Sequence, residues 1–191
     1  MGGTVFRTLS LIAVLAVTAC NTVAGVSYAP TGNVVAVASP EIASVAVTDQ
    51  RKEAPTRLAT IMGGFGNPLK TLDTPTPVKD VVADAFTQGL QARGMLASRE
   101  APFRIFVTLR KFDADMIVGR TARIDLTMQV ANQSGRVVFQ RDAADSVSDM
   151  KLLQTGVFAS IDDLRVLSQT VLDRTVDKLL DDPSFRSAIG A

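Results

Sequence analysis

The feature that most limits the possible folds is a strict alternation of apolar and polar residues over residues 122–130. Apolar side chains occupy every second position, and arginine, aspartate, threonine and glutamine lie between them. Because successive side chains of a strand point to opposite faces, the pattern predicts a strand with one buried and one solvent-facing surface. Residues 132–135, Asn-Gln-Ser-Gly, are typical of a hairpin turn, and the apolar run from Val137 predicts a return strand that extends as far as Ser148.

Two further segments predict strands. Residues 42–48 are rich in β-branched side chains, and residues 104–112 carry apolar side chains on both faces. In the second segment a regular strand places Phe106 and Phe112 on the face opposite the other apolar side chains, which are Ile105, Val107 and Leu109. Residues 58–62 form another apolar patch, and the glycine-rich residues 63–68 interrupt the chain.

Two helices are predicted from apolar side chains at helical spacing. Thr76 and Pro77 are typical of a helix start, and Gly94 is a natural end for that helix. Ser160 can cap a longer helix, which the sequence Asp182-Pro183 ends. Residues 185–189 are expected to add a short terminal turn.

The order strand, helix, three antiparallel strands, helix predicts an α+β fold. We expect a mixed, mostly antiparallel sheet of four or five strands with two helices packed on one face. A right-handed crossover places strand 42–48 parallel to strand 104–112. Residues 41–191 are predicted to be a single domain, and residues 20–40 a tether, part of which can pair with the edge of the domain.

The single cysteine, Cys20, follows a short apolar run near the start of the chain. Arg7 gives the preceding segment its positive charge, and residues 9–17 are apolar apart from one serine. As a helix this run spans roughly 14 Å, about half of a hydrocarbon core of ~30 Å, so it is too short for a stable membrane span. Residues 1–19 are therefore predicted to be a secretory signal peptide.

The residues Val17-Thr18-Ala19-Cys20 resemble the lipobox of bacterial lipoproteins. The resemblance implies a lipidation site at Cys20, with fatty acyl chains such as palmitate that anchor the protein to a membrane. Two or more chains hold a protein on a bilayer essentially permanently, since each buried methylene contributes ~0.8 kcal/mol. Asn21 stands where an aspartate marks inner-membrane retention in enteric bacteria, which implies the periplasmic side of the outer membrane. The alternative is an ordinary secreted protein with a free thiol.

Composition excludes several function classes. Arg7 is the one charged residue of the predicted signal, so the mature chain carries 19 basic and 19 acidic side chains, and nothing in this balance attracts nucleic acid. The chain has no histidine, and lipidation of its one cysteine leaves no thiol, so the usual general base and the usual ligands of transition metals are missing. We expect no metal, no cofactor and no catalytic activity.

Asp49 and Arg51 are the pair that most resembles a site. They lie two residues apart at the end of a predicted strand, so their side chains point the same way and can bind a partner's backbone or a polar ligand. The commoner alternative is an ion pair that ties the strand end to a loop.

Three other patterns have an ordinary structural explanation. The glycines at 63, 64 and 66 lack the Gly-Lys-Ser/Thr ending of a phosphate loop, so we expect a flexible loop that carries Phe65 as an exposed anchor for a partner or a membrane surface. The spacing of Ser146, Ser148 and Lys151 does not require a Ser–Lys dyad. The aspartates of the last predicted helix do not form the oxygen loop that calcium needs, and we expect them to be a solvated face: Asp162, Asp163, Asp173, Asp177, Asp181 and Asp182.

Short motifs are spread over nearly the whole mature chain, namely Cys20, Tyr28-Ala-Pro30, Asp49-x-Arg51, Leu90-x-x-x-Gly94, Gly135-x-Val-Val-Phe139 and Leu179-Leu-Asp-Asp182. Together they resemble the YajG type of small bacterial lipoproteins, although the glycines at 63–66 and the absence of tryptophan depart from that pattern. The resemblance implies an envelope lipoprotein without a recognised enzymatic activity. A second family with a similar outline comprises the auxiliary lipoproteins of envelope lipid-transport systems.

Three functions follow from these observations. The first is a lipid-anchored binding or scaffold lipoprotein that presents its domain to an envelope protein. The second is an auxiliary component of lipid transport, in which a groove between sheet and helices receives an acyl chain or the domain contacts a transporter subunit; its basis is the apolar face at Phe106 and Phe112. An enzyme that uses a serine or Asp49 is the third, and the residue types favour it least.

Overall fold

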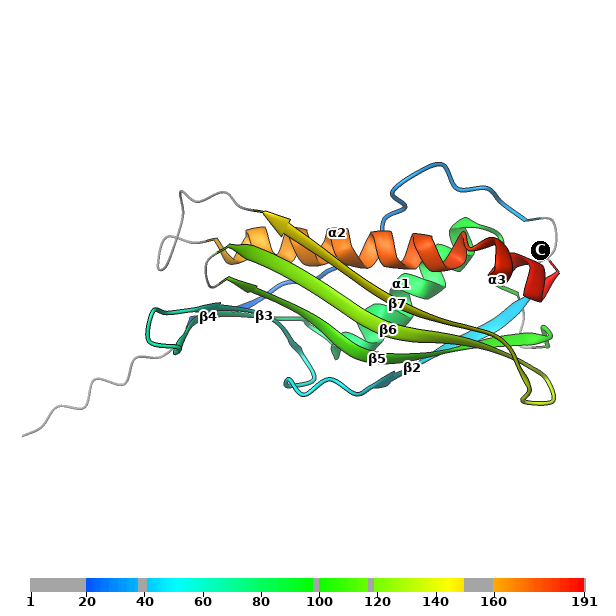
Figure 1. Ribbon diagram of the computed structural model, residues 1–191, viewed down its shortest axis with the longest axis horizontal. Helices are drawn as coiled ribbons and strands as arrows, with labels where there is room; N and C mark the ends of the chain where they lie inside the picture. Colours follow the sequence, from blue (N-terminus) through cyan, green and yellow to red (C-terminus); the bar gives the residue numbers. More distant parts are fainter. Residues whose placement is uncertain (1–19, 38–40, 98–99, 117–118, 150–159, 191) are drawn as a thin grey trace, which may run out of the picture.

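The computed structural model describes residues 20–37, 41–97, 100–116, 119–149 and 160–190. These residues form seven strands in one sheet and three helices (Figure 1). In chain order they are β1 (Cys20–Val23), β2 (Ile42–Asp49), β3 (Arg57–Met62), β4 (Pro68–Asp73), α1 (Val78–Ala92), β5 (Phe103–Met116), β6 (Arg120–Asn132), β7 (Val137–Asp149), α2 (Ile161–Leu180) and α3 (Pro183–Ile189).

The long strand β5 organises the sheet. On one side it pairs antiparallel with β6, which pairs antiparallel with β7. On the other side two strands follow one another along β5, both parallel to it: β2 along its first part, with Ile42 opposite Phe103, and β3 along its end, with Ala59 opposite Ala114. β4 is antiparallel to β3, and β1 is parallel to β4. The predicted parallel pairing of strands 42–48 and 104–112 is confirmed.

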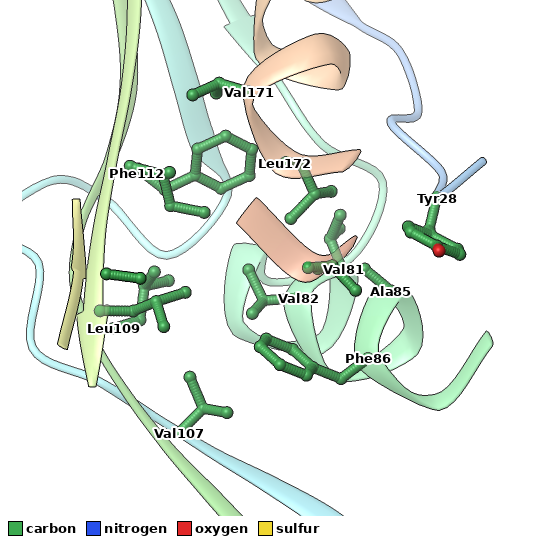
Figure 2. Close-up of a cluster of buried hydrophobic side chains, with 14 of the residues drawn as sticks. Tyr28, Val81, Val82, Ala85, Phe86, Val107, Leu109, Phe112, Val171 and Leu172 are labelled. Atoms are coloured by element: carbon green, nitrogen blue, oxygen red, sulfur yellow. The ribbon is translucent and has the colours of Figure 1, made fainter. Parts of the chain in front are cut away.

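Helices α1 and α2 cover one face of the sheet and bury the alternating side chains of β5 and β6 (Figure 1). The predicted alternation over residues 122–130 is confirmed, because its apolar members are buried and its polar members are partly exposed. Figure 2 shows the space between the layers filled by side chains of β5, α1 and α2. The labelled core residues include Val107, Leu109, Phe112, Val82, Phe86, Val171 and Leu172.

The predicted sheet of four or five strands with two helices is too small. The three strands beyond the four predicted segments are short, with four residues in β1 and six each in β3 and β4. Segments of this length carry too few residues to establish a periodicity of two. The pairing of β1 with β4 agrees with the expectation that part of residues 20–40 pairs with the edge of the domain. The region predicted as a terminal turn is the helix α3, in which Pro183 occupies the first turn and the Asp182 side chain accepts hydrogen bonds from the backbone of Ser184 and Phe185.

A β-bulge in β5 overturns the predicted position of Phe112. The pairing between β5 and β6 shifts between Leu109 and Lys111, so the residues after the bulge change faces. Phe112 is therefore fully buried in the core beside Leu109, whereas Phe106 is 44% exposed on the outer face. The apolar outer face on which the lipid-transport hypothesis was based is reduced to Phe106.

The ends of α1 and α2 follow most of the predicted signals. Pro77 caps α1 without a side-chain hydrogen bond, so the predicted cap at Thr76 is wrong. Gly94 has a φ of 65°, and its amide and that of the next residue return to the carbonyls of Gln91 and Leu90, as in a Schellman motif. At the start of α2, the Ser160 side chain accepts a hydrogen bond from the backbone of Asp162. Lys151 lies outside the described residues.

Candidate functional site

Cys20, the predicted lipidation site, is exposed at the first position of β1. Parallel pairing places it opposite Lys70 in β4. The strand is held further by the Asn21 side chain, which accepts a hydrogen bond from Thr71, and by the amide of Ala24, which donates to the carbonyl of Asp73. Cys20 therefore begins an ordered edge strand of the domain. The predicted signal peptide, residues 1–19, lies outside the described residues.

Residues 24–37, here called the N-terminal strap, leave β1 and run over the two long helices. Val26 and Tyr28 are buried members of the core. The Tyr28 ring covers a close crossing of α1 and α2 at Gly89, where an added Cβ would lie 2.7 Å from a Leu180 methyl carbon and 3.5 Å from the Tyr28 ring. The strap lies within the predicted tether, residues 20–40, yet it contributes side chains to the core.

A buried polar cluster fastens the strap to the helices. Its centre is Arg93, whose side chain is 1% exposed. Arg93 donates two hydrogen bonds to the Asp181 carboxylate, at 2.9 and 2.6 Å, and one each to Asp177 (2.8 Å), the Tyr28 hydroxyl (3.0 Å) and the Gly89 carbonyl (3.1 Å). All five donors of the guanidinium are engaged by these partners, which come from the strap, α1 and the end of α2.

Asp177 joins the strap to this cluster from the other side. Its carboxylate accepts hydrogen bonds from the Tyr28 hydroxyl and from the backbone and hydroxyl of Thr31, the last two at 2.7 and 2.5 Å. One turn earlier, Asp173 accepts from the backbone of Ala29 at 3.1 Å. These bonds satisfy backbone groups of the strap that have no sheet partner.

The cluster shifts the ionisation of its members. Burial, followed by the hydrogen bond to Asp177, raises the pKa of Tyr28 to about 12. Burial alone would lower the pKa of Arg93, but its hydrogen bonds to Asp181, Tyr28 and Asp177 outweigh burial and raise it. The pKa of Asp181 is lowered, first by its hydrogen bond from Arg93. The cluster is therefore a charged network at neutral pH that holds the strap in place.

These contacts correct the predicted solvated face for Asp173 and Asp177, whereas Asp162 and Asp181 are exposed as predicted. Asp173 and Asp177 are buried and bind the strap. Asp163 pairs with the buried Arg120 at 2.9 Å, and Asp182 pairs with Arg141 and caps α3. Helical periodicity missed these roles because polar partners reach α2 from segments distant in sequence. The signal that could have found them is Tyr28, a large aromatic side chain in a segment predicted to be a tether.

Asp49 and Arg51 form an ion pair at 2.9 Å. The Arg51 side chain has no exposed surface, and its guanidinium also donates to the backbone carbonyls of Arg57, Phe112 and Pro55 at 2.9 to 3.2 Å. These bonds tie the end of β2 to the loop before β3 and to β5. Burial raises the pKa of Asp49, but the hydrogen bonds from Arg51 outweigh burial and lower it. The Asp49 side chain remains 20% exposed, and a partner contact at this pair stays a prediction.

The remaining predicted positions do not meet in one site. The glycines at 63–66 form the turn of the β3–β4 hairpin, with Phe65 fully exposed. Ser148 faces the Thr121 hydroxyl at 3.2 Å across the β6–β7 pair, and Ser146 is exposed on β7. Within the described ranges, no three His, Cys, Asp or Glu side chains are grouped so that they could hold a metal ion.

Open hollows lie on the surface of the domain. One of about 450 Å³ is bordered by Phe103, Arg136 and Val138 at the ends of β5 and β7. Another, of about 350 Å³, lies beside the Arg93 cluster between Thr31 and Lys178. Neither is a groove between the sheet and the helix layer, where the core side chains in Figure 2 lie.

Comparison with known protein families matches residues 30–190 to a family described as uncharacterized lipoprotein. This chain belongs to that lipoprotein family. The match begins after Cys20, so the cysteine itself lies outside the matched residues. It supports the predicted bacterial lipoprotein, whereas the YajG type stays a prediction.

Solved structures with a TM-score above 0.5 show the same fold at low sequence identity. The crystal structure of protein XCC0632 from Xanthomonas campestris is 16% identical, with a TM-score of 0.57 over 87% of this chain and 96% of that chain. A crystal structure named only as an uncharacterized protein is 12% identical, with a TM-score of 0.51 over 84% and 96%. A minor lipoprotein from Acinetobacter baumannii is 12% identical, with a TM-score of 0.47 over 78% and 96%.

No curated protein matches the sequence of this lipoprotein. The description of the family refers to no catalytic activity. In the part of the chain that the structure describes, no helix combines the length and the apolar character needed to cross a membrane.

Proposed function

We propose that this lipoprotein is acylated at Cys20 and acts as a non-catalytic binding or scaffold protein of the cell envelope, on the periplasmic side of the outer membrane. The observation that carries the proposal is the position of Cys20, exposed at the first residue of an edge strand in a chain of a lipoprotein family. Because β1 is paired with β4, a lipid on Cys20 is joined to the sheet without a flexible spacer. Such a link holds the domain close to the membrane.

A scaffold role agrees with the internal contacts that the buried polar side chains of this chain make. Arg93, Asp177 and Arg51 are engaged in internal contacts that stabilise the fold. The chain has no histidine to act as a general base near neutral pH. Asp49 and Arg51 remain the predicted polar contact to an envelope protein, with the exposed part of the Asp49 carboxylate as the accessible acceptor.

The anchor is tested by intact mass spectrometry of the mature protein from envelope membranes, beside a Cys20→Ser variant. We expect a mass that begins at residue 20 and includes a diacylglyceryl group and an acyl chain, and we expect the variant to lack them. An unmodified thiol or an uncleaved leader in the wild-type protein would refute the proposal.

The choice of membrane is tested with Asn21→Asp. In an enteric host, we expect the wild-type protein in the outer-membrane fractions of a density gradient and the variant in the inner-membrane fractions. Asn21 is exposed in β1, so the variant keeps the core unchanged. Wild-type protein in the inner-membrane fractions would contradict the outer-membrane assignment.

The scaffold role is tested by crosslinking in intact envelopes followed by purification of the acylated protein. We expect a specific envelope protein that is lost or reduced with Asp49→Asn, while Asp125→Asn, on the outer face of β6, serves as the matched control. Recovery of no protein above background would count against a scaffold.

A further inference from the structure

We propose that the turn of the β3–β4 hairpin, residues 63–67, is a second membrane contact, in which Phe65 inserts into the headgroup region of the bilayer that holds the acylated Cys20. The proposal rests on the proposed lipid anchor and deepens it. Its basis is that the pairing of β1 with β4 places the anchor and this turn at the same end of the sheet.

The strand register determines which end of the sheet faces the membrane. Cys20 lies opposite Lys70, and β1 and β4 run in the same direction. Pro68 precedes Lys70 by two positions, so it lies roughly 7 Å further than Cys20 toward that end of the sheet, and the turn lies beyond it. Figure 1 shows this hairpin at one end of the molecule and the turn between β6 and β7 at the other. A lipid on Cys20 therefore brings the hairpin turn to the bilayer surface.

The turn is built to present one apolar side chain. The amide of Gly63 donates to the carbonyl of Asn67 at 2.7 Å, and the amide of Gly66 donates to the carbonyl of Gly63 at 2.9 Å. Gly66 has a φ of 78°, a backbone conformation that favours glycine, and a Cβ on Gly63 would lie 2.8 Å from the Asn67 side chain, which would have to move. Phe65 projects from this closed turn with its whole side chain exposed.

The charge pattern of the hairpin favours a bilayer over water. No Asp, Glu, Lys or Arg occurs from Leu58 to Leu69, a long uncharged stretch in a chain that is 20% charged. A phenylalanine at the membrane surface removes apolar area from water without bringing a charge into the headgroup region. One such side chain binds weakly by itself, but the anchor keeps it at the surface, so its insertion is intramolecular. The contact would fix the tilt of the domain.

The absence of tryptophan from the chain makes the test direct, because Phe65→Trp introduces a single tryptophan, whose emission can be excited apart from that of Tyr28. The acylated mature variant is reconstituted into vesicles of phosphatidylethanolamine and phosphatidylglycerol, with and without bromine-labelled acyl chains. The matched control is Val137→Trp, which replaces another exposed apolar residue (48% exposed) at the start of β7, at the opposite end of the sheet.

We expect the emission of the Phe65→Trp protein to shift to shorter wavelength in vesicles and to be quenched by the brominated lipid, and the emission of Val137→Trp to do neither. Equal or absent quenching in an acylated protein that floats with the vesicles overturns the membrane contact and leaves the anchor standing. An intact mass without acyl groups refutes the anchor, and the membrane contact with it. The two failures are therefore separated by the mass measurement.

Discussion

Arg93 at the end of α1 and Asp181 at the end of α2 form a two-point ion pair, with Nε to Oδ1 at 2.9 Å and Nη2 to Oδ2 at 2.6 Å. The parallel geometry is the strongest that a guanidinium and a carboxylate can adopt. The pair closes the helix layer, and the bonds of Arg93 and Asp177 to Tyr28 extend it to the strap. Three segments far apart in the sequence are thus joined at one buried cation.

Replacing Arg93 is expected to be strongly destabilising. Arg93→Met leaves the partly buried Asp177 without its cation, and loss of one partner of a buried pair typically costs about 3–5 kcal/mol of unfolding free energy. Urea unfolding followed by circular dichroism measures the loss. The matched control is Arg110→Met on the outer face of the sheet, where the ion pair with Asp125 is 37% and 38% exposed and contributes under ~1 kcal/mol. Equal losses in the two variants would show that the Arg93 cluster contributes no more than a surface pair.

The stability of the domain is expected to fall at high pH through Tyr28. Its pKa is about 12 in the folded protein against an ordinary value of 10.0, so the fold favours the protonated phenol. The contribution of the protonated Tyr28 to the unfolding free energy is fully present below pH 10.0 and is lost as the pH rises through about 12. Tyr28 is the one tyrosine of the chain, so phenolate absorbance follows its ionisation directly.

The absorbance titration separates this explanation from general alkaline unfolding. We expect folded wild-type protein to ionise near pH 12 and Asp177→Asn, which removes the acceptor charge beside the phenol, to ionise closer to 10.0. In Tyr28→Phe, the unfolding free energy should no longer fall with pH between 10.0 and about 12 through ionisation of this side chain. A wild-type tyrosine that titrates at its ordinary pKa while the protein stays folded would contradict the buried hydrogen bond.

The bulge in β5 can be tested by replacing Phe112 and Phe106, which lie on the same strand, with alanine. Phe112→Ala empties a fully buried position and is expected to lower the unfolding free energy by about 3–5 kcal/mol. Phe106 is 44% exposed on the outer face, so Phe106→Ala is expected to cost no more than about 1 kcal/mol. Urea unfolding of both variants is the measurement. Similar losses would place the two rings in similar environments, as an uninterrupted strand does.

The local pattern predicted the elements that bury one face along a regular period. The alternation over residues 122–130 specifies which side of β6 is buried, because a strand repeats every two residues whatever its neighbours are. The helix ends at Gly94 and Ser160 could also be predicted from the sequence. A left-handed glycine and a capping hydroxyl each act within one turn of the helix, so their signals are local. For the candidate site, the sequence singled out Cys20 and the pair Asp49 and Arg51. The structure joins Asp49 and Arg51 in an ion pair but does not bring Cys20 into a common site with them.

The sequence by itself determined the α+β class, the two long helices, the strands β5 to β7 and the lipobox-like start of the chain. Each of these features depends on a pattern of residues close together along the chain. Only the tertiary structure decided that Phe112 faces the core, that Asp173 and Asp177 hold the strap, and that Cys20 lies at the same end of the sheet as Phe65. A bulge changes the face of every residue after it, and an aspartate on a helix is solvated or buried according to what packs on it. Those partners are distant in sequence, so no local period reports them.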